Sequence, residues 1–252
     1  FTQVVPEEYR DILSQIHDAF IAGDQPRELR QEWEVQRKEG EKRTIIAEAA
    51  LTHGDDGKAR KVTFVVDITG RKQLEEQLQQ ANERLDYLAH HDELTGIFNR
   101  RAGLRCLEQE LDRCQRYGNR LSVVMYDLDE FKHINDTHGH SVGDEVLNAL
   151  TQLILQGIRT TDFLVRLGGE EFLIIMPEVD VDAAYQAAER LRRQVADTPM
   201  TAHGLTVTLS AGVASYREAS TTRLLERVDK AMYQAKQAGR NRVAMAQDDT
   251  PR

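Results

Sequence analysis

Two adjacent carboxylates, Glu170 and Glu171, follow a pair of glycines and lie between two short apolar runs. Paired glycines supply the positive φ angles that tight hairpin turns require, so this segment predicts a β-hairpin with acids at its tip. One interpretation is plain surface charge, because turn tips are solvated and Glu is common on surfaces. The other is a divalent-cation site, because such ions prefer clustered oxygen ligands.

A second apolar stretch, residues 121–128, also ends in acids. Asp127 and Asp129 share a face of this predicted strand, since side chains alternate with a period of two. If the strand neighbours the hairpin, Asp127 and Glu170 converge and can bind one cation. For Asp129 a simpler interpretation is an acid at a helix N-terminus, where the helix dipole favours negative charge.

The run Gly-Gly-Glu-Glu-Phe at 168–172, with Asp-Leu-Asp-Glu-Phe-Lys at 127–132 upstream, resembles the GGDEF family of diguanylate cyclases in its GGEEF form. Further motifs in the family's order extend the resemblance over residues 90 to 247. The resemblance implies an α/β fold, an α+β sandwich of the nucleotidyl-cyclase (palm-like) type with a central, mostly antiparallel sheet. It also implies condensation of two GTP into cyclic di-GMP, with release of two pyrophosphates.

The resemblance also assigns the metal and catalytic residues. Asp127, Glu170 and the carbonyl of Leu128 would hold Mg²⁺ or Mn²⁺, with two ions in each active site. Two metals can activate an attacking 3′-hydroxyl and neutralise the leaving pyrophosphate. Glu171 would either help to hold the second ion or take the proton, and the sequence leaves both roles open.

Asn135 and Asp144 match the family's guanine-binding segment. Guanine presents two donors on its N1 and 2-amino edge, so an acceptor-only carboxylate suits it, and the aspartate favours GTP over ATP. The competing interpretation of Asp144 is structural, because Ser141 and Asp144 have the spacing of a helix capping box.

Three cations are candidates for binding the triphosphate. Lys132 lies one helical turn before Asn135 and on the same face. Lys236 and Arg240 match the family's second phosphate contact. As isolated charges near a helix end, all three would instead be surface residues that complement the helix dipole.

Arg159 and Asp162, just before the hairpin, resemble the family's inhibitory product site, and Arg190 on the following predicted helix is a further candidate. A guanidinium can bind a guanine edge with two hydrogen bonds, while the carboxylate receives the ring donors. The alternative is an ordinary ion pair between residues three apart.

Length and charge bound the remaining possibilities. The length of 252 residues favours two domains. The net charge of -9 argues against nucleic acid or an anionic membrane as the main partner. No apolar run approaches the ~20 residues of a membrane span. The chain begins at Phe1 without a signal-peptide pattern, so we expect a soluble, excised fragment from the bacterial cytoplasm whose parent could be membrane-anchored. Cys106 and Cys114 are expected to be free thiols.

Four regions are predicted. Residues 1–69, with a helix over 6–22 and strands near 28–38, 43–53 and 59–68, resemble the C-terminal part of a PAS sensor domain, which closes on Asp-Ile-Thr at 67–69. Residues 70–91 form a helix with a heptad seam, which favours a parallel coiled-coil dimer over an amphipathic helix packed on its own domain. The catalytic region spans 92–247, and 248–252 is a tail. The seam residues are Leu74, Leu78, Ala81, Leu85 and Leu88.

The catalytic region should alternate helices and strands. Strands are expected at 121–128, at the apolar runs 163–165 and 173–176 on either side of the glycines, at 205–213 and near Val243. Helices are expected after Gly96, at 130–137, from Gly143 to 158, at 181–196 and at 221–238, with Gly139 and Gly143 breaking the chain. Two rival functions remain open, a catalytically inactive receptor for GTP or cyclic di-GMP and a dimerisation or interaction module.

Overall fold

The computed structural model describes residues 11, 14–15, 18–19, 28–37, 39–57, 59–217 and 220–247. Most of the helix expected over 6–22, and the tail at 248–252, lie outside these residues. The chain forms two compact units, Phe1–Arg84 and Leu85–Arg252. Among the described residues, no helix is both long and apolar enough to cross a bilayer.

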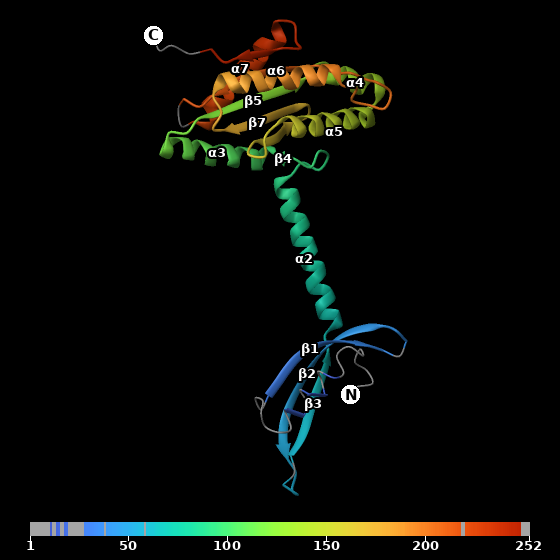
Figure 1. The fold of residues 1–252 in the computed structure, drawn as a ribbon. Coiled ribbons are helices and arrows are strands. Elements are labelled where there is room, and N and C mark those ends of the chain that lie inside the picture. Colours follow the sequence, from blue (N-terminus) through green and yellow to red (C-terminus); the bar gives the residue numbers. More distant parts are fainter. Residues whose placement is uncertain are drawn as a thin grey trace. The chain divides into compact units, whose positions relative to one another are not determined.

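The first unit contains a three-stranded antiparallel sheet, in the order β1-β2-β3 (Figure 1). The strands are β1 (Glu28–Gln36), β2 (Lys42–His53) and β3 (Ala59–Asp67), which confirms the three predicted strands. Helix α2 (Thr69–His90) follows directly after β3. It covers the segment with the predicted heptad seam.

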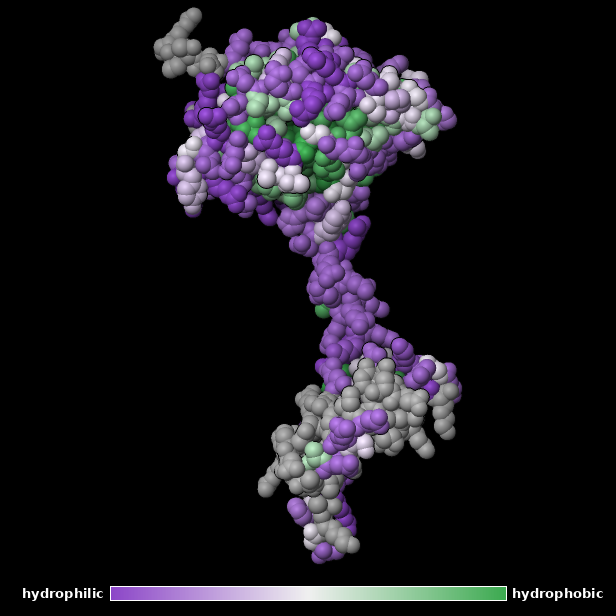
Figure 2. All heavy atoms as spheres, viewed as in Figure 1, coloured by the Kyte–Doolittle hydropathy of each residue, from purple (hydrophilic) through white to green (hydrophobic). Residues whose placement is uncertain are grey.

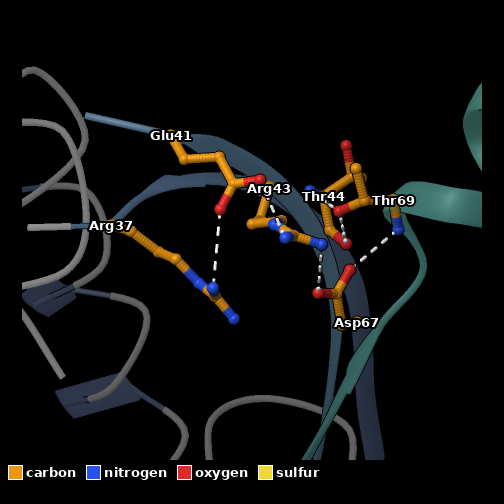
Figure 3. A network of polar contacts seen from close by, with 6 residues as sticks. All are labelled: Arg37, Glu41, Arg43, Thr44, Asp67 and Thr69. Atoms are coloured by element: carbon orange, nitrogen blue, oxygen red, sulfur yellow. Dashed lines mark hydrogen bonds and ion pairs between the residues drawn. The ribbon is translucent and has the colours of Figure 1, made fainter. Parts of the chain in front are cut away.

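Polar contacts at the start of α2 tie it to the sheet of the first unit (Figure 3). The Thr69 hydroxyl accepts a hydrogen bond from the Thr44 backbone N–H at 2.9 Å, and the Asp67 carboxylate accepts one from the Thr69 N–H at 2.9 Å. Arg43 bridges Asp67 and Glu41 at 3.3 and 2.8 Å. These bonds from Thr69, with Arg43 nearby, hold the pKa of Asp67 below its usual value. The Asp-Ile-Thr segment therefore fixes where the strand ends and the helix begins.

The second unit is built on a six-stranded mixed sheet, in the order β4-β6-β7-β5-β8-β9. The outer pairs β4–β6 and β8–β9 are parallel, while β6–β7, β5–β7 and β5–β8 are antiparallel. The central sheet is thus mostly antiparallel, as expected. Its strands are β4 (Phe98–Asn99), β5 (Leu121–Leu128), β6 (Phe163–Gly168), β7 (Glu171–Pro177), β8 (Leu209–Ser215) and β9 (Val243–Met245).

Helices cover both faces of this sheet (Figure 1). They are α3 (Arg100–Tyr117), α4 (Phe131–His138), α5 (His140–Gly157), α6 (Val181–Asp197) and α7 (Thr221–Gln237). Alternate residues of β5 divide between two cores. Tyr126 and Leu128 pack with α4, α5 and α6, whereas Val123 and Met125 pack with α3 and α7. The period-two pattern therefore builds an α+β sandwich.

The structure corrects two boundaries. Gly143 does not break the chain, because it lies inside α5, where it is buried. The predicted strand at 205–213 begins only at Leu209, although the Thr208 carbonyl still accepts a hydrogen bond from the Asp129 N–H at 2.9 Å. The two-residue strand β4 was not predicted. Cys106 and Cys114 are free, as expected.

Candidate functional site

The hairpin tip forms as predicted, between β6 and β7. Gly168 has a φ of 153° and Gly169 a φ of 51°, which L side chains rarely adopt, so the glycines are needed here. Arg166 holds the turn, because its guanidinium donates to the Gly169 carbonyl at 2.8 and 3.1 Å and to Asp92 at 2.8 Å. Burial raises the pKa of Asp92, but hydrogen bonds from Arg166 and Thr95 outweigh it and leave the pKa below its usual value. The acidic tip is thus anchored to the segment that follows α2.

The carboxylates of β5 and the hairpin meet at one sheet edge. Strands β5 and β7 lie side by side (Figure 1), and Asp127 is paired with Glu171 in their register. The Leu128 N–H donates to the Glu170 carbonyl at 3.3 Å. The predicted convergence of Asp127 and Glu170 is therefore present. Asp127 is buried, and both glutamates are half-buried.

Lys236 of α7 lies on the Asp127 carboxylate, with its Nζ 2.7 Å from Oδ2. Asp127 lies on the same strand face as Met125 and Val123, and α7 covers that face. This placement brings Lys236 of α7 into contact with Asp127. Burial raises the pKa of Asp127 to about 6, Lys236 opposes this rise, and Glu170 and Glu171 add to it.

The donor set at this edge fits a hard divalent cation that keeps several waters. Glu170 and Glu171 lie near enough to the Asp127 carboxylate to raise its pKa, and that carboxylate already binds the ammonium group of Lys236. Within the described residues, no group of three or more His, Cys, Asp or Glu side chains is arranged to hold a metal ion. A sparse site of this kind suits Mg²⁺, which commonly takes one or two carboxylates together with substrate phosphates.

Asp129 is a buried structural acceptor, not a helix-terminal charge. Its Oδ1 accepts from the Ser210 hydroxyl at 2.6 Å, and its Oδ2 accepts from the Thr208 hydroxyl at 2.7 Å and from the Asn241 N–H at 3.0 Å. The residue before α4 is Glu130, which makes no side-chain cap. The dipole interpretation of Asp129 is therefore wrong, because three donors from other elements occupy its oxygens.

Of the three predicted phosphate cations, two already contact acids, one at the end of β5 and one in the turn that follows it. Lys236 binds Asp127. The Nε of Arg240 lies 3.2 Å from the Glu130 carboxylate, and the side chains of Arg240 and Glu130 are each more than half exposed. Lys132 is exposed on α4. The structure thus brings Lys236 and Arg240 to the acidic edge, where a phosphate would compete with carboxylates for them.

Asn135 and Asp144 lie on the adjoining helices α4 and α5. The Oδ1 of Asn135 is buried and, among the described residues, has no hydrogen-bond partner. A Cβ on Gly143 would clash with this oxygen, so only glycine leaves room for the amide. Asp144 is exposed one residue further on. The capping-box interpretation is wrong, because the N-cap of α5 is Gly139 and Ser141 lies inside the helix.

Arg159 and Asp162 form a turn before β6. Asp162 is buried, and its Oδ2 accepts from the Arg159 N–H at 2.9 Å. Its Oδ1 is buried without a partner among the described residues, and burial raises the pKa of this carboxyl. The interpretation as a side-chain ion pair is not supported, since the contact runs through the backbone of Arg159.

A pocket of about 420 Å³ adjoins this turn. Arg113, Arg120 and Arg159 all line it. Arg113 and Arg120 were not predicted from the sequence, because nothing in their local pattern separates them from other surface arginines. Arg190 lines a different depression on α6, and it donates to the Gly157 carbonyl at 3.2 Å. Of the three predicted product-site residues, Arg159 therefore lines the first of these pockets and Arg190 the second.

Comparison with known proteins points to one family. Residues 89–242 match the family described as "Diguanylate cyclase, GGDEF domain". Diguanylate cyclase DgcM of Escherichia coli is 43% identical over 189 residues, which cover 73% of this chain and 43% of DgcM. The chain thus spans less than half the length of that relative.

Solved structures give the same result. The coiled coil and GGDEF domain of DgcB from Caulobacter crescentus, in complex with c-di-GMP, matches with a TM-score of 0.65 and 28% identity, over 71% of this chain and 97% of that one. The active GGEEF domain of a diguanylate cyclase from Vibrio cholerae matches with a TM-score of 0.57 and 35% identity, over 60% of this chain and 98% of that one. With the acidic hairpin, the fold and these matches in agreement, the chain belongs to the GGDEF family of diguanylate cyclases.

Proposed function

We propose that this chain condenses two GTP molecules into cyclic di-GMP and two pyrophosphates, with a divalent metal as cofactor. The observation that carries the proposal is the meeting of Asp127 with Glu170 and Glu171 at one sheet edge, around a carboxylate that already binds a cationic group. A GTP-consuming enzyme of this type works in the bacterial cytoplasm. The relatives named diguanylate cyclases support the activity.

Each residue has a distinct task in this proposal. Asp127, Glu170 and the Leu128 carbonyl hold Mg²⁺ or Mn²⁺. When bound, such ions polarise the α-phosphate and neutralise the charge of the departing pyrophosphate. Asn135 and Asp144 bind the guanine edge. Lys132, Lys236 and Arg240 bind the triphosphate, and Lys236 exchanges Asp127 for a phosphate oxygen.

The reaction joins two nucleotides. The 3′-hydroxyl oxygen of one GTP forms a bond to the α-phosphorus of the other, and the bond to the bridging oxygen of the β-phosphate breaks, so that pyrophosphate leaves with the electron pair. The hydroxyl loses its proton to a base. Glu171 is the candidate for this role, since its strand position faces Asp127.

Two active sites must face each other for this reaction, so we propose a homodimer. The seam of α2 supports it, because Leu74, Leu78 and Leu85 are 66%, 60% and 63% exposed. In Figure 2 the rest of the α2 surface is mostly hydrophilic. A parallel coiled coil would bury these leucines against a second copy. Residues 1–69 would then act as a partial PAS-like sensor segment, 70–91 as the linker, and 92–247 as the catalytic domain.

We also propose feedback inhibition by the product at Arg159 and Asp162, with Arg190 as a further contact. The unpartnered Oδ1 of Asp162 supports a ligand that brings hydrogen-bond donors, such as a guanine edge. Loss of inhibition in an Arg159→Ala variant is the expected result. Unchanged inhibition would count against this site.

The activity is tested by incubating the protein with Mg²⁺ and GTP, and separately with ATP, and identifying the products by mass. We expect cyclic di-GMP in the incubation with GTP and no dinucleotide in the incubation with ATP. Asp127→Ala and Glu170→Ala should abolish synthesis, whereas Glu226→Ala, an exposed acid on α7, should not. No dinucleotide with retained GTP binding would favour a receptor. No nucleotide binding at all would favour an interaction module.

A further inference from the structure

The turn after α7 has an unusual backbone. Gly239, Arg240 and Asn241 have φ angles of 110°, 60° and 45°, so three consecutive residues are left-handed and two of them are not glycine. Non-glycine residues keep such a conformation only where their surroundings enforce it. This turn carries Arg240, and it follows the last turn of α7, which carries Lys236. The turn therefore aims Arg240 directly, and it is tied to the backbone of Lys236, whose carbonyl accepts a hydrogen bond from the Gly239 N–H at 3.3 Å.

Asn241 is held from two sides. Its backbone N–H donates to the buried Asp129 carboxylate at 3.0 Å, which ties the turn to the end of β5. Its side-chain Oδ1 accepts from Nη1 of Arg192 on α6 at 2.6 Å. Asp129 is itself fixed by the hydroxyls of Thr208 and Ser210. The turn is thus held by Asp129, just after β5, and by Arg192 of α6.

Arg192 is oriented for this contact. Its guanidinium makes three hydrogen bonds to the Glu189 carboxylate, one turn earlier on α6, at 3.1 to 3.3 Å. The side chains of Arg192 and Glu189 are only 15% and 17% exposed. A guanidinium held by a carboxylate is preorganised, so Arg192 can present its remaining Nη1 to Asn241 with little further loss of freedom.

We propose that Arg192 and Asp129 are positioning residues that act through Asn241 to place Arg240 and Lys236 for the triphosphate. The inference rests on the proposed function. Neither residue touches the nucleotide. Their task is to hold a strained turn whose relaxed form would draw Arg240 away from the metal edge.

The test uses Arg192→Ala in the full chain, and because Arg192 is nearly buried, a comparison of two ligands separates a local effect from a structural defect. The matched control is Arg193→Ala. Arg193 is 71% exposed and contacts Glu189 at 3.6 Å, but not Asn241. Binding of GTP and of GMP, which lacks two of the three phosphates, is measured calorimetrically with Mg²⁺, and the KM and kcat for GTP are measured alongside.

Arg192→Ala should weaken GTP binding roughly tenfold, the effect of one lost hydrogen bond to a charged group, and leave GMP binding within a factor of about two. The KM for GTP should rise with it, and Arg192→Lys should recover part of the loss. In an Arg240→Ala background, Arg192→Ala should add little, because residues that act through one another are not additive. The control variant should match the unaltered protein.

Equal weakening of GTP binding and GMP binding would overturn the proposal, because it would indicate a general structural defect. Unchanged GTP binding, or additive effects of the two substitutions, would also overturn it. The proposed function fails separately: if the unaltered protein makes no dinucleotide but binds GTP, the activity is refuted while the comparison of GTP with GMP still decides the role of Arg192.

Discussion

The Asp127 carboxylate lies between opposing influences, since burial disfavours its charge and Lys236 stabilises it. Its pKa is raised above the unfolded value, so ionised Asp127 costs stability at neutral pH. That cost disappears as the pH falls from above 6 toward the unfolded pKa. A protonated Asp127 binds neither Lys236 nor a divalent cation. Cation binding at this carboxylate should therefore weaken as the pH falls through the folded pKa of this residue.

This balance gives a direct prediction in cation-free protein. Carboxyl-selective NMR should show Asp127 titrating with a pKa of about 6. Lys236→Met should raise that pKa further, because it removes the charge that opposes the effect of burial. Lys230→Met, at an exposed position of the same helix, should leave it unchanged. A lower or unaltered pKa in Lys236→Met would contradict the ion pair.

Gly143 is a second residue-scale test. An alanine Cβ there would clash with Oδ1 of Asn135, so we expect Gly143→Ala to displace the amide and weaken GTP binding about tenfold or more. Stability should change less, because alanine suits a helix better than glycine. Ser141→Ala, in the same first turn of α5, should bind GTP normally. Normal binding by Gly143→Ala would remove Asn135 from the guanine site.

The elements that carry these residues were largely predictable from the sequence. The apolar run at 121–128 and the hairpin at the two glycines follow from strand periodicity and turn chemistry, and both occur at the predicted residues. Gly143 misled the prediction because glycine commonly ends a helix or breaks the chain, as Gly139 does four residues earlier, just before α5 begins. Its actual role is a close approach of α5 to Asn135, which depends on tertiary packing that no local pattern records.

A similar close approach joins β8 to α7. A Cβ on Gly212 would clash with the backbone of Val228 and Met232, so the strand and the helix pack backbone to backbone. We expect Gly212→Ala to destabilise the second unit by about 1–3 kcal/mol, the usual cost of overpacking. Chemical denaturation followed by a probe in this unit measures the effect. An unchanged midpoint would show that the helix can shift without loss.

At the scale of the whole chain, the sequence separated a region with a metal and nucleotide pattern from an N-terminal region with a strand meander. Apart from the expected approach of Asp127 and Glu170, it did not reveal the contacts between distant segments. Three features join residues that are far apart in sequence. They are the ion pair of Lys236 with Asp127, the three hydrogen bonds of Asp129, and the group of arginines around the pocket near Arg159. Spacing alone carries no signal for such contacts.

The homodimer is the prediction that belongs to this scale. Leu78→Lys places a charge in the exposed seam of α2, so light scattering should show a loss of dimer and the rate of synthesis should fall with it. Gln80→Lys, at an exposed position of the same helix outside the seam, should keep the dimer. A dimer that survives Leu78→Lys would place the contact between copies elsewhere.

A metal site shared by β5 and the hairpin tip can be measured by titrating the protein with Mn²⁺ in the presence of GTP, followed by electron paramagnetic resonance. We expect tight, GTP-dependent Mn²⁺ binding that is lost in Asp127→Asn and in Glu170→Gln alike, because both segments supply one site together. Mn²⁺ binding that survives either substitution at full strength would contradict a shared site.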